Sequence, residues 1–455
     1  MNNVWTNGLG FPRLRAGLVI ATCVLANALV ARPLTAQQVL EEGQETEGVR
    51  TVSLDEALKI ALRRNPSLDQ ARSSVELTEF DRLNAYGSFL PNINLTYGYS
   101  NASTGRLDPT GQSITRTSYS STLGASYDLF TGLRRQSTLK SARLGVAAEN
   151  ARLRQSEYQI IHDVKQAYFN AIASRELVNV QRETVQRQID QLNFVQQQVD
   201  LGRATRSDLL RSQVDLNNAK LDLLNAENAA RASTFQLGEV LGIEERVAPV
   251  AEATLETEPF NLSREQLLRR ALAGAPSVTS AVASARAANA SVGSARSAYL
   301  PSLTFNGGWA WQDAGFPPSN RSWSLSLRGS YPLFNGFQRE SAIYRAQAQA
   351  NQAHAQERAA RLAVRKDVDA AYSQIRSAEA AISLAEQSVE LSQESLRVIQ
   401  ERYRLGLATI LDLEQAQITL SQSQVDLINR RFDYQIGLAQ LESLLGQDLK
   451  GRGGR

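Results

Sequence analysis

The stretch Tyr-Asp-Leu-Phe-Thr-Gly at residues 127–132 recurs as Tyr-Pro-Leu-Phe-Asn-Gly at residues 331–336, 204 positions later in the 455-residue chain. The stretch Leu-Gly-Arg-Ala-Thr at residues 201–205 recurs as Leu-Gly-Leu-Ala-Thr at residues 405–409 with the same offset. A fixed offset over this distance indicates a tandem repeat without insertions between these points. We therefore predict two copies of one structural unit.

The two copies differ in length only near their beginning. Leu90-Pro91 recurs as Leu300-Pro301, 210 positions later, so a six-residue difference falls between Pro91 and Tyr127. Pro249, Pro259 and several glutamates make the segment between the copies an irregular linker. The predicted order is a signal peptide (1–36), an N-terminal extended segment (37–52), a first repeat (53–242), a linker (243–261), a second repeat (262–447) and a C-terminal tail (448–455).

The N-terminus has the pattern of a secretory signal. Arg13 and Arg15 precede an apolar run over residues 16–30, and small residues follow as far as Ala36, after which we predict cleavage. The run is shorter than the roughly 20 residues that span a bilayer. A lipoprotein anchor at Cys23 is the alternative, and it is disfavoured because this cysteine lies within the apolar run.

Removal of residues 1–36 changes the bulk properties of the chain. These residues contain three arginines and no acid, so the net charge becomes 3 − 3 = 0 and does not favour nucleic-acid binding. The single cysteine is lost too, which excludes disulfides and thiolate metal sites. His162 and His354 each stand alone in a helical stretch, so we expect no metal site and no cofactor.

Very long helices are predicted in both copies. Residues 337–405 contain neither Gly nor Pro, which corresponds to roughly 100 Å of α-helix. The matching residues 133–201 contain one glycine, Gly145. Helices of this length need neighbours along their whole length, as in a coiled coil. Leucines spaced by seven in the returning helices fit such packing: Leu209, Leu216 and Leu223, and Leu413, Leu420 and Leu427.

A tight turn is predicted at the end of each long helix. Gly202 and Gly406 are placed to adopt the left-handed conformation that closes a helix. Thr205 and Thr409 then lie three residues before Asp208 and Asp412, a spacing that resembles the capping box, although Asp is a weaker match than Glu or Gln. Each copy is therefore expected to contain a helical hairpin.

Four segments have the period of two that is typical of transmembrane β-strands. In residues 93–99, 119–127, 303–311 and 323–331, apolar or aromatic residues alternate with small polar ones. An aromatic belt at the membrane surface is predicted from Trp309, Trp311, Trp323, Tyr97, Tyr99 and Tyr119. A soluble sandwich is the alternative, but four strands make little sheet to bury.

Four strands cannot close a barrel, and an open sheet edge leaves backbone groups unsatisfied in lipid. Several copies must therefore share one barrel. Two copies give eight strands with a nearly filled interior, and three give twelve strands with a usable lumen. The strand pattern favours three copies only weakly.

The repeated plan of strand hairpin, very long helix, glycine tip and returning helix resembles the TolC-like outer membrane efflux proteins, over residues 53–447. The motifs that carry the resemblance are Leu90-Pro91 and Leu300-Pro301, Leu129-Phe130-x-Gly132 and Leu333-Phe334-x-Gly336, and the two tips. The resemblance implies an α+β membrane protein, with four strands per chain in a shared twelve-stranded barrel of a homotrimer and a coiled-coil periplasmic tunnel.

The resemblance also implies location in outer membrane lipid and two protein partners. A periplasmic membrane-fusion adaptor would dock onto the tips and connect them to an inner-membrane transporter, while the channel is a passive gated conduit. An equatorial belt is expected from residues 37–64, 243–272 and the C-terminus. The predicted docking residues are Leu201, Gly202, Thr205, Leu405, Gly406 and Thr409, which a purely structural turn would also explain.

The same resemblance places a gate near the second tip. Tyr403 occupies the position of the gating tyrosine and Asp412 that of the first aperture aspartate. Gln415, with Glu414 beside it, replaces the next aspartate, and Ala408 replaces the expected arginine; Arg404 or Arg203 are alternative partners. Three copies of Asp412 near a pore axis would attract cations.

Helix capping is the simpler explanation for both tip aspartates. A carboxylate in the first turn of a helix is favoured by the helix dipole. This explanation applies fully to Asp208 and partly to Asp412, and we retain both as candidate aperture residues. The main rival function is a soluble periplasmic coiled-coil scaffold or adaptor. An enzyme is not expected, because no nucleophile–base pair or phosphate loop is evident.

Overall fold

The computed structural model describes residues 49–107, 114–251, 253, 255 and 259–449. The predicted signal peptide, residues 37–48 of the extended segment and residues 450–455 of the tail lie outside the described residues. All described residues belong to one unit, Glu47–Arg455. In this part of the chain, no helix is both long enough and apolar enough to cross a membrane.

The helices of the two halves have matching lengths. α3 and α7 each contain 67 residues, and α4 and α8 each contain 36. α3 continues through Gly145 without interruption. The bounds are α1 Leu54–Arg64, α2 Pro66–Gly87, α3 Arg134–Asp200, α4 Arg206–Leu241, α5 Arg264–Gly274, α6 Pro276–Arg296, α7 Gln338–Arg404 and α8 Ile410–Leu445, with a short 3₁₀-helix at Ser297–Tyr299.

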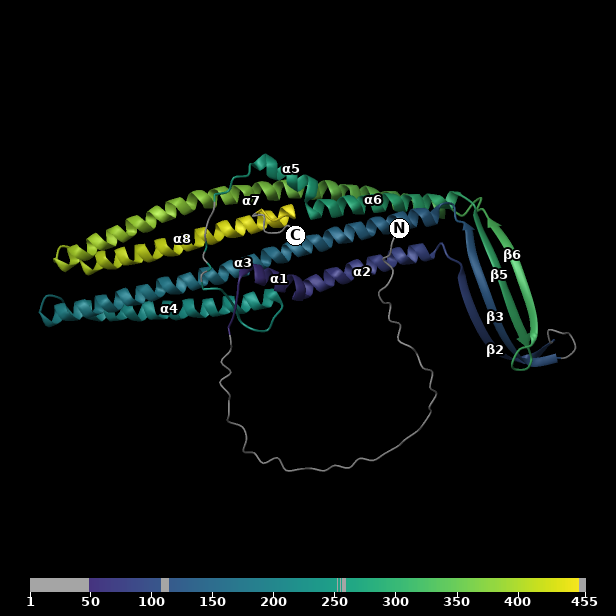
Figure 1. The fold of residues 1–455 in the computed structure, drawn as a ribbon, viewed down its shortest axis with the longest axis horizontal. Helices are drawn as coiled ribbons and strands as arrows, with labels where there is room; N and C mark the ends of the chain where they lie inside the picture. Colours follow the sequence, from purple (N-terminus) through teal and green to yellow (C-terminus); the bar gives the residue numbers. More distant parts are fainter. Residues whose placement is uncertain (1–48, 108–113, 252, 254, 256–258, 450–455) are drawn as a thin grey trace, which may run out of the picture. The chain divides into compact units, whose positions relative to one another are not determined.

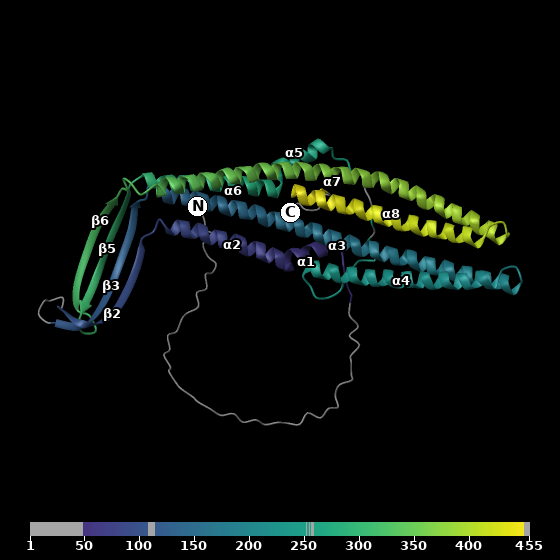
Figure 2. The same cartoon turned by 180° about the vertical axis from the view of Figure 1, so that it is seen from behind.

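Two helical hairpins lie side by side. α3 packs along α4, α7 packs along α8, and the two hairpins meet where α3 contacts α8 (Figures 1 and 2). Towards the tips the order across the layer is therefore α4, α3, α8, α7. Towards the strands, α2 covers α3, and α6 lies between α3 and α7. Each long helix thus has neighbours along its length, as its length requires.

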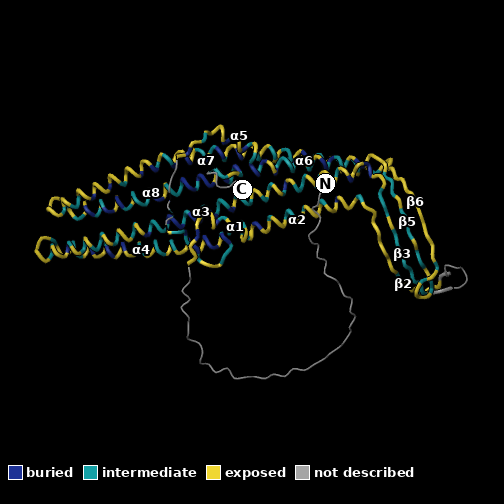
Figure 3. Tube along the Cα trace, viewed as in Figure 1, coloured by how far each residue is buried: buried dark blue, intermediate teal, exposed yellow. Residues whose placement is uncertain are grey.

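The core is concentrated at the middle of the long helices, and exposed residues dominate near the tips and on the strands (Figure 3). One buried cluster surrounds α3 and includes Val164, Tyr168, Ile172, Leu237 and Leu241. The other surrounds α7 and includes Val368, Ile375, Leu438, Leu441 and Leu445. α1 and α5 each close one cluster through apolar residues on one face.

A buried ion pair joins the two halves at this level. Lys165 of α3 pairs with Glu442 of α8, and the side chain of Glu442 is 4% exposed. A second oxygen of this carboxylate accepts a hydrogen bond from the backbone N–H of Leu449, 3.2 Å away. Burial raises the pKa of Glu442, and Lys165 opposes this shift. The described end of the C-terminal segment is thereby attached to both halves.

A two-stranded parallel sheet joins the predicted N-terminal extended segment to the linker for which irregular structure was predicted. β1 (Arg50–Val52) pairs with β4 (Val247–Pro249), within the predicted extended segment and linker. Val52 and Val247 are fully buried, and the Tyr168 hydroxyl donates to the Val52 carbonyl at 3.3 Å. The prediction of a wholly irregular linker is therefore wrong. Strands of three residues are too short to show a period of two.

The four predicted strands form one antiparallel sheet in the order β2-β3-β5-β6. Their bounds are β2 Asn92–Leu107, β3 Ile114–Phe130, β5 Ser302–Asp313 and β6 Asn320–Ser330. The register pairs Leu95 with Leu123, Leu123 with Trp309, and Trp309 with Trp323, so these residues share a face. β2 and β6 are the edges of this sheet.

Candidate functional site

The two hairpin tips have nearly identical backbones. Gly202 and Gly406 follow the ends of α3 and α7, with φ angles of +70° and +72°. Glycine adopts this left-handed conformation without the strain that a side chain would bring. A Cβ at either position would meet no atom within 4 Å. Glycine is therefore favoured by the backbone conformation, and the space around both tips is open.

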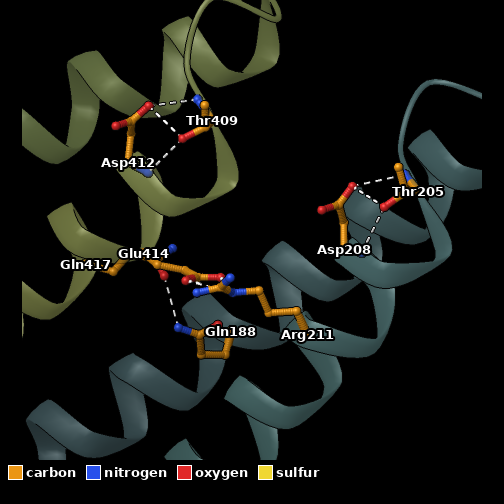
Figure 4. Close-up of polar contacts among 8 residues, drawn as sticks. All are labelled: Gln188, Thr205, Asp208, Arg211, Thr409, Asp412, Glu414 and Gln417. Atoms are coloured by element: carbon orange, nitrogen blue, oxygen red, sulfur yellow. Dashed lines mark hydrogen bonds and ion pairs between the residues drawn. The ribbon is translucent and has the colours of Figure 1, made fainter.

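Both returning helices begin with a capping box. The Asp412 carboxylate accepts hydrogen bonds from the Thr409 backbone N–H and hydroxyl, both at 2.8 Å, and Thr409 Oγ1 accepts from the Asp412 N–H at 3.2 Å (Figure 4). Thr205 and Asp208 make the same three bonds at 3.0, 2.8 and 3.2 Å. The predicted caps are confirmed, with Asp serving at the third helical position.

These caps affect the charge of Asp412. The Thr409 backbone N–H, followed by the Thr409 hydroxyl, lowers the pKa of the Asp412 carboxyl. Hydrogen bonds of this kind stabilise the charged form. Asp412 is also exposed. It is therefore a negatively charged residue at neutral pH that both caps α8 and faces solvent in the single chain.

The tips expose apolar side chains. Leu201 is 64% exposed and Leu405 is 73% exposed, although both end long helices. Leu407 in the second tip is 64% exposed, and its counterpart in the first tip is Arg203. The predicted docking residues thus lie together at each tip. The second tip presents the more apolar surface of the two.

Tyr403 lies between the two hairpins. Its ring packs against that of Phe194 in α3, with centroids 5.7 Å apart. On its own hairpin it packs against the cluster of Leu396, Leu413 and Leu420. Burial raises the pKa of its hydroxyl. The sequence did not indicate Phe194, because a single aromatic residue in a long helix is an ordinary packing residue.

Glu414 has an arginine partner from the other half of the chain. The Arg211 Nε of α4 donates to both carboxylate oxygens of Glu414 in α8, at 2.9 and 3.1 Å (Figure 4). Partial burial raises the pKa of Glu414 and nearby Asp215 raises it further, whereas Arg211 lowers it. Close to this pair, Gln188 of α3 donates to Gln417 of α8 at 2.9 Å.

The alternative arginine partners lie elsewhere. Arg404 pairs with Glu401 on its own helix at 3.1 Å, and Arg203 is exposed on the first tip. Gln415 is exposed and its amide donates to the Thr419 hydroxyl at 3.4 Å. The structure thus brings Tyr403 and Glu414 to the contact between hairpins and leaves Asp412 and Gln415 outside it. Arg211 carried no local signal in the sequence, because its partner Glu414 lies 203 residues away along the chain.

The predicted belt residues share one face of the sheet. Trp309 lies between Leu123 and Trp323 in one row, and the adjacent row contains Tyr97 and Trp311. Tyr99 and Tyr119 are cross-strand partners with ring centroids 5.1 Å apart. Trp323 is 72% exposed and Trp309 is 51% exposed. Aromatic residues collected in three neighbouring rows of an exposed face are typical of a membrane interface.

Long paired helical hairpins attached to an open sheet with an exposed aromatic face define an outer-membrane export component. The chain belongs to the outer membrane efflux protein family, whose model matches residues 57–243 and 267–447. The predicted family, efflux function and outer-membrane location are thereby confirmed, and the family consists of channel proteins, not of enzymes.

Individual relatives match over most of the chain. The outer membrane efflux protein BepC of Brucella suis biovar 1 is 23% identical over 425 residues, covering 91% of this chain and 90% of the relative. The outer membrane protein TolC of Vibrio cholerae serotype O1 is 26% identical over 409 residues, covering 86% and 87%. The CmeC outer membrane channel of Campylobacter jejuni has the same fold, with a TM-score of 0.76 at 16% identity over 93% of this chain and 95% of CmeC.

Proposed function

We propose that three copies of this chain form a passive, gated channel through the outer membrane. The observation that carries this proposal is the four-stranded sheet with two unpaired edges, β2 and β6, and an exposed aromatic face. In lipid, edge N–H and C=O groups must be paired, so β6 of one copy must pair with β2 of the next. Three copies give twelve strands, the number that the family resemblance implies.

Two outer helices of the chain, α4 and α7, expose apolar side chains. α4 exposes Leu210, Val214, Leu221 and Leu224, and α7 exposes Leu384, Leu391 and Val398. Successive members of the α7 group are seven residues apart, the spacing of a coiled-coil seam. Exposed apolar stripes of this size indicate a partner. We assign α7 of one copy to pack against α4 of the next, which closes a tunnel around the axis.

The gate is formed by contacts that hold the two hairpins of one chain together near the tips. Three pairs cross from the first hairpin to the second: Phe194 with Tyr403, Gln188 with Gln417, and Arg211 with Glu414. Opening requires the hairpins to separate, which breaks these contacts. In the closed trimer, Asp412 from each copy lies near the axis and attracts cations.

The tips are the docking surface for a periplasmic membrane-fusion adaptor, which connects the channel to an inner-membrane transporter. The exposed Leu201 and Leu405 support this assignment, because apolar side chains beside an open glycine turn have no cover in the described chain. The transporter supplies the energy, and the channel provides the path.

The test is reconstitution of the mature protein. We expect it to be extracted from the outer membrane by detergent as a trimer and to give discrete conductance steps in a planar bilayer. The rival, a soluble periplasmic scaffold, predicts a monomer that is released without detergent and gives no conductance. Either of those two results would exclude the channel.

A further inference from the structure

Near the helices, one row of the sheet carries charged residues on its polar face. Asp128 of β3 is the cross-strand partner of Thr304 in β5, and Thr304 is the partner of Arg328 in β6. The Thr304 hydroxyl donates to the Asp128 carboxylate at 2.8 Å. This row lies at the end of the strands that adjoins the helices, close to the start of α3.

The rest of this face is uncharged over the next four rows. From the row of Ser126 to the row of Ser120, the described residues on the polar face are Ser, Thr, Asn, Gln, Gly or Ala. Such side chains form a hydrated surface without charged groups. An isolated acid and an isolated base in one row therefore concentrate the electrostatic field at one level of the sheet.

We propose that Asp128 and Arg328 form a charged ring at the junction of barrel and helical tunnel, and that this ring favours passage of solutes bearing an anionic group. The inference rests on the proposed trimer, in which the polar face lines the lumen. Three copies then place three arginines and three aspartates at one level. Rings of charged side chains are a common basis of ion selectivity in pores.

Arg328 and Asp128 contribute unequally to the electrostatic potential at this level of the sheet. Arg328 is exposed and has a long side chain that extends from the sheet, whereas Asp128 is partly buried and bonded to Thr304. Asp128 also lines a pocket of about 820 Å³, together with Asp81 of α2, Arg134 and Arg135 of α3 and residues of α6. Arg328 therefore dominates the potential within the roughly 8 Å over which charges act at physiological salt.

The experiment measures reversal potentials of the purified trimer in a planar bilayer under a KCl gradient. Arg328→Gln is expected to shift the reversal potential towards cation selectivity, and Asp128→Asn towards anion selectivity. Arg328→Lys keeps the charge and is expected to retain the wild-type value. The matched control is Arg321→Gln on the same strand, because Arg321 pairs with Trp311 and so belongs to the opposite face.

The outcomes separate the two proposals. Absence of conductance in the wild type would exclude the channel and the ring together. Conductance with the same reversal potential in Arg328→Gln and Arg321→Gln would overturn the ring alone. Loss of trimers in Arg328→Gln, with trimers and wild-type selectivity in Asp128→Asn, would show that Arg328 serves the contact between copies and would also overturn it.

Discussion

Asp208 and Asp412 make the same hydrogen bonds in equivalent helices, yet only Asp412 belongs to the second tip, where the aperture is proposed. The cap accounts for the presence of both residues. The cap leaves Asp412 negatively charged, because it lowers the pKa of this carboxyl and the side chain is exposed. Asp208 is therefore a matched control for any role that Asp412 has beyond capping.

Asp412→Asn should reduce the cation preference of the channel and its block by multivalent cations. The physical reason is loss of three negative charges at a constriction. The measurement is single-channel conductance in a planar bilayer with and without a trivalent cation. Asp208→Asn removes an equivalent cap and should change neither property. If the two variants showed the same cation preference and the same block, Asp412 would have no role beyond capping.

Arg211→Ala should increase the open probability of the channel. The substitution removes the guanidinium whose Nε–H is shared by both Glu414 oxygens, and leaves a partly buried carboxylate without its cationic partner at the contact between hairpins. Single-channel recording measures the effect. Arg404→Ala is the control, because Arg404 pairs within its own helix and should leave gating unchanged. An open probability of the Arg211→Ala channel equal to that of the wild type would contradict the proposed role of this pair in the gate.

The residues of the proposed gate differ in how well the sequence alone predicts them. Tyr403 and Glu414 were found by position relative to a motif, and both lie at the contact between hairpins. Arg211 was missed because its partner is 203 residues away and no local pattern links the two. A long-range pair depends on how α4 and α8 are placed by all the packing between them.

At the scale of elements, Gly406→Arg should impair efflux while trimers persist. The tip has room for a side chain, so the cost falls on the left-handed backbone and on the docking surface. Drug tolerance of cells expressing the variant, together with trimer content, measures the effect. Gly406→Asn is the control, since Asn tolerates this conformation and adds little bulk. Normal efflux with Gly406→Arg would exclude docking at this tip.

Helices and strands were largely predictable because each has its own period. The glycine turns defined the ends of α3 and α7, and the threonine caps defined the starts of α4 and α8, each to within a few residues. The strands of the first hairpin are longer than their alternating segments, reaching 16 and 17 residues. β1 and β4 were not predicted because their pairing is stabilised by tertiary burial, which has no local signature.

At the scale of the whole molecule, the proposed trimer predicts a specific cross-link. Leu221 lies 16 residues after Thr205 in α4, and Leu391 lies 14 residues before Leu405 in α7, so both stand at a similar height above the tips. The double variant Leu221→Cys/Leu391→Cys should form covalent dimers and trimers on oxidation. Denaturing gel electrophoresis without reductant measures them.

The single variants Leu221→Cys and Leu391→Cys provide the controls for this cross-link. Each lacks the cysteine that the neighbouring copy would need, so neither should form a covalent trimer. Within one chain, α3 and α8 separate α4 from α7 (Figures 1 and 2). Purely intramolecular products in the double variant would therefore contradict the assigned contact between copies.

The number of copies is the feature that the sequence defines least. Alternating strands predict an unsatisfied edge, and heptad stripes predict a neighbour, but neither fixes how many chains close the ring. That number depends on strand tilt and on the angle between adjacent copies, which arise only when copies associate. The family resemblance supplied the number three.

The equal lengths of the paired helices, 67 and 36 residues in both halves, restrict how this protein can change in size. A heptad inserted into α3 and α4 alone would displace one tip from the other by roughly 10 Å along the axis. The docking surface would then become a staggered rim instead of a level one. A longer tunnel for a wider periplasm therefore needs four coordinated insertions in one gene, one in each of α3, α4, α7 and α8. Length changes in one repeat of the gene should be matched by equal changes in the other.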